Sequence, residues 1–486
     1  MSSFRKDFLS GTFYIGIAKY AGILCQIFIT AILARLLTPN DYGVIAIAMV
    51  FIALFNTLSD IGIGVAVIQR KDFTNTDLDH LYSLSIYLGL FLSFILFLSS
   101  SAISSFYNNN QLLYVCELLC MLVFFTCART VPMNLLYREK KFKYIAFTNL
   151  FVHVLCGVAA IIAALMGCGV YALVLSQILS AFLLFVTYSI KYRRHFYFRV
   201  DISPLKRVFS YSAYNFAGTI FIYLTQNIDK LLVGKFIGTK PLGFYEKSYN
   251  LVFMPINNIT FIITPVLHPL FSEFQNDLKE LERKFLRIIE YLSYISFPLA
   301  IIFFFTSKEL ILIFYGDQWY PAIPPFQIMS IAISFMILDT TVGSIYNAAN
   351  ETKRGFYTML IMSCTMIASI SIAIYLWNSI IAVAYAFLFA RVVATLMNFY
   401  SLTHGLDGKF IDFLSCIFRP VIVGILLFVV LYLISIFMQV DNIFISFIIK
   451  VATGLAASLL LIQLISGHNL ITLAKEKIKS LHSIKK

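Results

Sequence analysis

Ionisable side chains inside long apolar segments are the residues of this sequence best placed to do chemistry. Lys19 lies in GIAKYAG and Arg391 in LFARVVA, both near the middle of their apolar segments. An ionised side chain costs about 2.5–3.5 kcal/mol at the centre of a membrane helix, so it normally faces a cavity or a partner. Lys19 and Arg391 are therefore candidate ligands for an anion. The structural alternative is that Lys19 pairs with a carboxylate such as Asp339.

Two acidic residues are candidates for ion coupling. Asp229 precedes Lys230 near the end of one apolar segment, and Asp60 lies at the end of another, in SDIGIG. An apolar environment favours the protonated carboxyl, which makes proton exchange near neutral pH possible. For Asp229 the alternative is an ion pair with Lys230 that closes a helix end. For Asp60 the alternative is a side chain that reaches the membrane surface.

Patterns typical of catalytic, metal-binding or cofactor-binding sites are missing from the sequence. It contains no Gly-x-Ser-x-Gly, no phosphate-binding glycine-rich loop and no histidine cluster. Nearly all of the eight cysteines lie in apolar segments, and none forms Cys-x-x-Cys. The sequence therefore predicts a protein that is not an enzyme and that has no cofactor or bound metal.

The composition predicts that membrane helices carry these residues. Hydrophobic residues make up 60% of the chain and charged residues 13%, against roughly 25% charged residues in soluble domains. This excludes a soluble enzyme of this size and a disordered protein. The net charge of +13 could indicate a nucleic-acid partner. However, no polar stretch alternates basic and aromatic residues, so we assign the excess to cytoplasmic loops near anionic lipids and expect no nucleic acid.

Hydropathy predicts an all-α polytopic membrane protein with about 14 transmembrane helices. A spanning helix needs about 20 mostly apolar residues. Turn-forming residues at Gly167-Cys168-Gly169 and at Trp377-Asn378 divide two longer apolar stretches into two helices each. The predicted spans are 11–36, 43–66, 80–103, 111–134, 146–166, 169–190, 208–236, 247–271, 286–306, 325–346, 356–376, 379–401, 416–437 and 443–466.

Loop charges predict the orientation of the chain. Most Lys and Arg residues outside the spans lie in alternate loops and at both ends of the sequence. Cytoplasmic loops carry such an excess, so we expect both termini in the cytoplasm. The loops of the opposite side are short and contain few basic residues: Arg35, Lys235, Lys240, Lys247 and Lys308.

A weak internal repeat predicts two lobes. RLLTPNDYGV at 35–44 corresponds to KFIGTKPLGF at 235–244, and Gln26 corresponds to Gln226. The separation covers six spans, an even number, so the repeats would be parallel and related by an axis along the membrane normal. The alternative is that both are merely two helices joined by a turn. The predicted domains are two six-helix lobes and a unit with two further helices and a basic tail: 1–200, 201–405 and 406–486.

Six motifs in order resemble one known family. They are ARLLTPNDYG (34–43), SDIGIGVAVIQR (59–70), LLYREKKFKYIAF (135–147), NIDKLLVGKFIGTKPLGFYEKSYNL (227–251), HPLFSEFQND (268–277) and FYGDQWYPAIPP (314–325). The sequence resembles the Wzx-type polysaccharide exporters of the multidrug/oligosaccharidyl-lipid/polysaccharide superfamily, up to about residue 400. The last two spans match mainly in hydropathy.

This resemblance implies a flippase of the inner (plasma) membrane. Such proteins move a polyprenyl-pyrophosphate-linked oligosaccharide to the outer leaflet by alternating access, for surface-polysaccharide synthesis. The implied partners are this substrate, membrane lipids, protons or sodium ions, and a polysaccharide polymerase. The substrate's pyrophosphate needs cationic donors, for which Lys19 and Arg391 are candidates. Three amides could bind sugar hydroxyls: Gln26, Gln226 and Asn227.

Two other functions stay open on sequence grounds. A drug/cation antiporter of the same superfamily usually has twelve spans, whereas this sequence predicts about fourteen. A membrane-embedded glycan polymerase or ligase usually has a large outer loop with catalytic Arg or His. The outer loops predicted here are short and contain no histidine, so the sequence favours the flippase.

Overall fold

The described chain is helical throughout its regular structure. The computed structural model describes residues 2–59, 62–201, 223, 226–275, 277–406, 408–438 and 440–466, with side chains except those of residues 2–15, 17, 18 and 268. Thirteen helical segments in these ranges are long and apolar enough to cross a membrane. They match every predicted span except 208–236, most of which lies outside the described residues. The prediction of an all-α, multi-pass membrane protein is confirmed.

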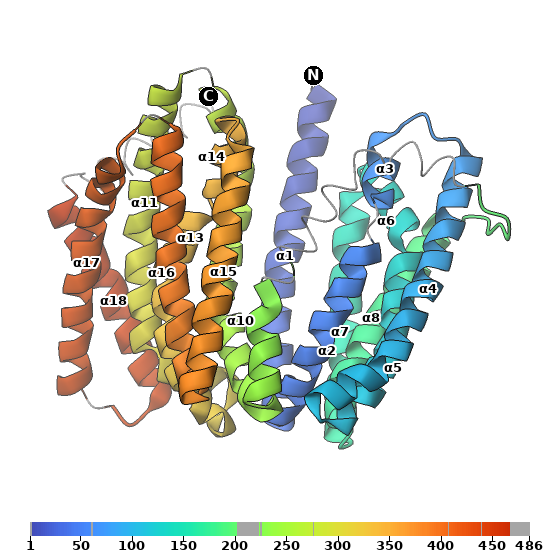
Figure 1. The fold of residues 1–486 in the computed structure, drawn as a ribbon, viewed down its shortest axis with the longest axis horizontal. Helices are drawn as coiled ribbons and strands as arrows, with labels where there is room; N and C mark the ends of the chain where they lie inside the picture. Colours follow the sequence, from blue (N-terminus) through green and yellow to red (C-terminus); the bar gives the residue numbers. More distant parts are fainter. Residues whose placement is uncertain are drawn as a thin grey trace. The chain divides into compact units, whose positions relative to one another are not determined.

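Contacts among the described residues group the chain into two compact units, residues 1–246 and 247–486. In the first unit α1 packs on α7, α4 packs on α5, and α8 contacts both α5 and α7 (Figure 1). The unit ends within α10. Its elements are α1 (Ser2–Leu36), α2 (Pro39–Ser59), α3 (Ile63–Gln69), α4 (Asn75–Tyr107), α5 (Asn110–Ala128), α6 (Thr130–Arg138), α7 (Phe142–Leu165), α8 (Val170–Lys191), helical residues 226–236, and the start of α10 (Thr239–Ser272).

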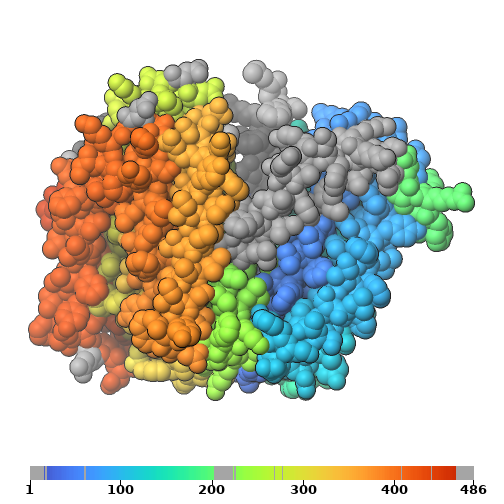
Figure 2. Space-filling view, viewed as in Figure 1, coloured from blue at the N-terminus to red at the C-terminus, as the bar shows by residue number. Residues whose placement is uncertain are grey.

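The second unit is built around α11, which packs against α13, α17 and α18. Helices α15 and α16 pack on each other and form much of the orange surface in Figure 2. The unit begins with the rest of α10. Its further elements are α11 (Leu278–Phe305), α12 (Ser307–Tyr315), a 3-10 turn (Asp317–Ala322), α13 (Ile323–Asp339), α14 (Val342–Ala348), α15 (Thr352–Trp377), α16 (Ile380–Gly405), α17 (Phe410–Phe437) and α18 (Ile443–Ile465).

Both predicted divisions of long apolar stretches are confirmed. Helix α7 ends at Leu165, and α8 begins after Gly167 and Gly169, whose φ angles are +81° and +54°. Helix α15 ends at Trp377, and Asn378 has a φ of +44°. Glycine and asparagine tolerate this left-handed conformation better than other residues, so they can end a helix where hydropathy alone shows no break.

Three predicted spans contain a break that the sequence analysis did not predict. The span 43–66 is divided between α2 and α3, 111–134 between α5 and α6, and 325–346 between α13 and α14. At the last break the hydroxyls of Thr340 and Thr341 donate to the carbonyls of Ile337 (2.7 Å) and Leu338 (2.8 Å). Such local bonds compete with the helical backbone pattern. These hydroxyl–carbonyl bonds do not change the mean hydropathy of the segment, so hydropathy does not reveal the break.

The outer surface of the described chain is unusually apolar. Phe151 is 69% exposed, Tyr375 89% and Leu464 79%. In water such side chains would favour association or aggregation. In a bilayer they face hydrocarbon, while hydroxyls inside the units bond to helix carbonyls, as Ser293 does to Ile289 at 2.7 Å. This distribution agrees with a multi-pass membrane protein.

The two turns of the sequence repeat contact each other inside the first unit. A Cβ atom added at Gly43 would overlap the backbone of Thr239, and one added at Gly243 would overlap the backbone of Pro39. The Thr239 hydroxyl also hydrogen-bonds the side-chain oxygen of Asn40. Gly43 corresponds to Gly243 in the repeat, and Pro39 corresponds to Thr239. The contacts Gly43–Thr239 and Gly243–Pro39 are therefore reciprocal. This reciprocity is what a local two-fold relation between equivalent turns produces.

We predict that Gly43→Ala destabilises the protein, because the new Cβ has no room against the Thr239 carbonyl. Overpacking of this kind costs about 1–3 kcal/mol. Gly343→Ala is the matched control, since it lies in a helix and its Cβ would meet no atom within 4 Å. Thermal unfolding of the purified variants should show a lower Tm for Gly43→Ala alone. Equal Tm values for the two variants would contradict the tight contact.

Candidate functional site

The first unit contains a buried polar cluster formed by Asp229, Lys230, Tyr245 and Glu246, which we call the Asp229 cluster. Asp229 is 1% exposed. Its Oδ2 accepts a hydrogen bond from the Tyr245 hydroxyl (2.9 Å), and its Oδ1 accepts one from the backbone N–H of Lys230 (2.9 Å). The Lys230 ammonium lies 3.0 Å from the Glu246 carboxylate. The cluster thus joins the helical residues 226–236 to the start of α10.

This arrangement differs in one respect from the ion pair offered as the alternative in the sequence analysis. The side-chain partner of Lys230 is Glu246, sixteen residues away, and Asp229 has Tyr245 as its side-chain hydrogen-bond donor. Tyr245 and Glu246 belong to the resemblance motif but were not singled out there. The sequence signal that could have indicated their role was that Tyr245 and Glu246, an aromatic hydroxyl and a carboxylate, are adjacent in an apolar helix. The second coupling candidate, Asp60, lies outside the described residues.

The remaining candidates of the first unit lie on two helices. Lys19 is half-buried on α1, and Gln26 is exposed seven residues later, which places both on one face of that helix. Gln226 is exposed, and Asn227 donates to the carbonyl of Tyr223 at 3.0 Å. Their grouping with Arg391 into one binding site therefore remains a prediction.

The second unit places Arg391 near the half-buried carboxylate of Asp339. The carboxylate of Asp339, at the end of α13, accepts hydrogen bonds from Thr395 Oγ1 (2.9 Å) and Asn398 Nδ2 (3.2 Å) of α16. Arg391, Thr395 and Asn398 have the spacing i, i+4, i+7, so they share one face of α16. Sequence reasoning missed Thr395 and Asn398, although this spacing from Arg391 was a readable signal.

Arg391 retains unused hydrogen-bonding capacity. Its guanidinium carbon lies 5.1 Å from the centre of the Phe387 ring, a cation–π contact that positions the side chain. Its Nε is buried and has no hydrogen-bond partner among the described residues. A buried donor without a partner costs about 1–3 kcal/mol, more for a charged group. An anionic ligand could satisfy it.

A buried lysine near the start of the second unit has a structural role. Lys247 is 3% exposed, and its ammonium lies 4.9 Å from the Tyr315 ring centre and 5.7 Å from that of Trp319. The neighbouring Ser248 donates to the carbonyl of Ala322 at 2.9 Å. These contacts tie α10 to the segment FYGDQWYPAIPP. They explain physically why that motif combines aromatic residues with a tight turn.

Lys450 of α18 also has a structural role. Its ammonium contacts the buried Glu309 carboxylate at 2.5 Å and donates to the carbonyl of Phe305 at 3.1 Å. Ser446 donates to the same carboxylate at 2.7 Å. These bonds fix α18 to α11 and α12 and leave Lys450 no need to reach the membrane surface.

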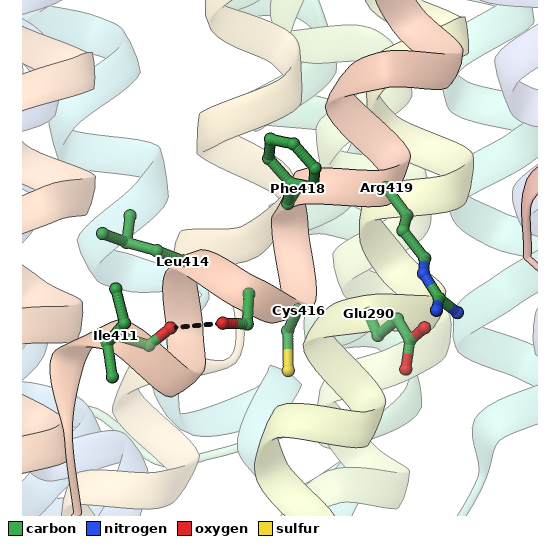
Figure 3. A pocket seen from close by; sticks show the side chains of 7 residues that line it. Glu290, Ile411, Leu414, Cys416, Phe418 and Arg419 are labelled. Atoms are coloured by element: carbon green, nitrogen blue, oxygen red, sulfur yellow. Dashed lines mark hydrogen bonds between the residues drawn. The ribbon is translucent and has the colours of Figure 1, made fainter.

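The described chain also contains hollows at its surface. One pocket of about 540 Å³ lies between α11 and α17, and Glu290 and Arg419 are among the residues that line it (Figure 3). A groove of about 760 Å³ lies between α15 and α16, with Lys353 and Tyr357 in its lining. Neither contains a predicted site residue.

Metal ligands do not gather in the described part of the chain. Within it, no three His, Cys, Asp or Glu residues lie close enough to hold a metal ion. All eight cysteines are free thiols.

Comparison with known proteins identifies the family. Residues 32–324 match the family described as "Polysaccharide biosynthesis protein". The chain belongs to this family. The predicted resemblance is thereby confirmed over more than half of the sequence.

Two bacterial polysaccharide biosynthesis proteins and a protein of the same fold resemble the chain over most of its length. It is 26% identical over 429 residues to the teichuronic acid biosynthesis protein TuaB of Bacillus subtilis, covering 87% of this chain and 88% of TuaB. It is 24% identical over 417 residues to the lipopolysaccharide biosynthesis protein WzxC of Escherichia coli, covering 84% and 83%. The inward closed structure of the lipid II flippase MurJ superposes with a TM-score of 0.72 at 16% identity, covering 93% of this chain and 98% of MurJ. This family protein therefore has the MurJ fold.

We predict that Lys230→Met destabilises the protein because it removes an ion-pair partner of the largely buried Glu246 carboxylate. Breaking a buried ion pair in this way costs about 3–5 kcal/mol. The double variant Lys230→Met with Glu246→Leu should recover most of the loss in Tm. If Lys230→Met instead keeps the parental Tm, the pair does not stabilise the fold and Lys230 is available for function.

Proposed function

We propose that this protein is a flippase that moves a polyprenyl-pyrophosphate-linked oligosaccharide across the plasma membrane for synthesis of a surface polysaccharide. The observation that carries the proposal is membership of the polysaccharide biosynthesis family combined with the fold of a lipid-linked precursor flippase over nearly its whole length. WzxC and TuaB, named for the synthesis of two different surface polymers, support the same role.

The charge of the substrate sets the main physical demand on such a protein. A pyrophosphate carries about two negative charges, and an ionised group is costly in hydrocarbon. The protein must therefore offer cationic donors along the path. We assign this task to Lys19 on α1 and to Arg391 on α16. The buried Nε of Arg391 without a partner supports this assignment.

Sugar recognition is assigned to the amide side chains of Gln26, Gln226 and Asn227. Gln26 shares a face of α1 with Lys19, and Gln226 is exposed on the repeat-related helix. Amides both donate and accept hydrogen bonds, which suits sugar hydroxyls. In this proposal the lobes 1–200 and 201–405 alternate between access to each leaflet, residues 406–486 are appended, and both termini lie in the cytoplasm. A polysaccharide polymerase would take up the exported units.

Ion coupling is assigned to Asp229, with Asp60 as the second candidate. The Asp229 carboxylate accepts a hydrogen bond from Tyr245, which holds α10 against the preceding helix. A proton added to this carboxylate would compete with that bond. Proton binding would therefore change the packing at the junction of these two helices. Sodium is the alternative coupling ion.

Leaflet location of the lipid-linked repeat unit in a deletion strain tests the proposed function. Spheroplasts of the deletion strain should accumulate the unit in a form that an added glycosidase or lectin does not reach, and the intact gene should restore access. Accumulation of accessible, unpolymerised units would favour a polymerase or ligase. Normal glycan with altered drug efflux would favour a cation antiporter.

We predict that Lys19→Glu abolishes export while the protein still inserts and purifies as a folded species, because it replaces an attractive charge by a repulsive one. Lys240→Glu is the control, since Lys240 is exposed at the start of α10. Export is measured as the accessible fraction of lipid-linked units. Normal export by a Lys19→Gln protein would show that Lys19 is structural and would move the proposed site toward Gln226 and Asn227.

We predict that Asp229→Asn removes the pH dependence of flipping, because an amide keeps a hydrogen-bonding oxygen for Tyr245 but cannot take up a proton. Flipping is measured in proteoliposomes at several external pH values. Tyr245→Phe is the matched control, since it removes the hydrogen bond and leaves the carboxylate. Unchanged pH dependence in Asp229→Asn would exclude Asp229 as the coupling residue.

A further inference from the structure

Two opposite charges face the pocket between α11 and α17 without pairing with each other. Glu290 comes from α11 and Arg419 from α17, and both line the cavity of about 540 Å³ (Figure 3). Neither side chain makes a hydrogen bond or an ion pair with another described residue. The hydroxyl of Ser415 donates to the carbonyl of Ile411 at 2.8 Å, so it is already occupied. Among the residues that line the pocket, Glu290 and Arg419 are therefore the charged groups with free hydrogen-bonding capacity, while the carboxylates of Asp412 and Glu282 lie close enough to act on Cys416 in the same lining.

The sequence places this pocket at the edge of the hydrocarbon layer. Residues 420–437 of α17, directly after Arg419, contain no Asp, Glu, Lys or Arg. At 1.5 Å per residue they span about 27 Å, close to the hydrocarbon thickness of a bilayer. Residues 291–305 of α11, directly after Glu290, also lack these four residue types. Both charges thus lie at the depth of lipid headgroups.

We propose that this pocket binds the zwitterionic headgroup of phosphatidylethanolamine, with its phosphate at Arg419 and its ammonium at Glu290. A guanidinium forms strong, directional hydrogen bonds to phosphate oxygens. An ammonium donates charge-assisted hydrogen bonds to a carboxylate. Phe418, which is 65% exposed, and Leu414 provide apolar surface in the same pocket for the adjoining acyl chains.

The charge balance of the pocket selects this occupant over other lipids. A zwitterion matches one positive and one negative group. Phosphatidylglycerol would satisfy Arg419 but leave Glu290 unpaired beside a second negative charge. Phosphatidylcholine has a trimethylated ammonium, which cannot donate a hydrogen bond to Glu290. The pyrophosphate of the proposed substrate, with about two negative charges, fits worse still, so this site is separate from the one assigned to Lys19 and Arg391.

Competitive lipid binding to the purified full-length protein tests the proposal. Native mass spectrometry with equimolar phosphatidylethanolamine, phosphatidylglycerol and phosphatidylcholine should show a preference for phosphatidylethanolamine of about tenfold, the value expected for one charge-assisted hydrogen bond. Glu290→Gln should abolish the preference over phosphatidylglycerol. Arg419→Gln should weaken binding of both phospholipids.

Lys353→Gln is the matched control, because Lys353 is an exposed basic residue that lines the separate groove between α15 and α16. It should bind the three lipids as the parent does, and all variants must keep the parental Tm. Equal binding of the three lipids by the parent would overturn the proposal. Unchanged lipid selectivity in a Glu290→Gln, Arg419→Gln double variant would also overturn the proposal. The two residues would then only balance each other's charge and would not determine which lipid binds. Displacement of phosphatidylethanolamine by an equimolar polyprenyl pyrophosphate would assign the pocket to the substrate.

Discussion

The low polarity of the bilayer interior is the constraint on which this structure depends. Hydrocarbon offers no hydrogen bonds, so every polar group at that depth needs a partner from the protein or from a ligand. The protein meets this demand for Lys450 with Glu309 and for Lys230 with Glu246. It meets it for Asp339 with the side chains of α16. Each of these bonds also joins two helices, so the same interaction satisfies the charge and stabilises the packing.

Helix positions could be predicted from the sequence because hydropathy is a local property. The divisions at Gly167 and Asn378 were readable as well, since those residue types tolerate the left-handed backbone that ends a helix. The break between α13 and α14 could not be predicted from the sequence. It depends on hydroxyl bonds of Thr340 and Thr341 to the preceding turn, and threonine forms such bonds in many unbroken helices too.

Charge partners could not be predicted, because they depend on which helices become neighbours. Asp229 and Lys230 are adjacent in sequence, yet their side chains bond to Tyr245 and Glu246 on the next helix. The repeat was a better guide over long range. Gly43 and Gly243 correspond in sequence, and each is required where its turn contacts the backbone of the other. A repeat fixes equivalent surfaces, and equivalent surfaces can pack reciprocally, whereas a single charge in a sequence does not specify its partner.

The charges that lack protein partners differ in kind from those that have them. A paired charge such as Lys450 contributes to packing and cannot be released without leaving Glu309 buried and unpaired. Arg391 has a buried donor to spare, and Glu290 and Arg419 face a cavity without bonding to the protein. Leaving the buried Arg391 donor unsatisfied is costly, so a ligand that satisfies it gains free energy that the fold did not use. A spare guanidinium donor suits an anion, and an unpaired carboxylate opposite a guanidinium suits a zwitterion, so we expect substrate and bilayer lipid to bind at separate places in the fold.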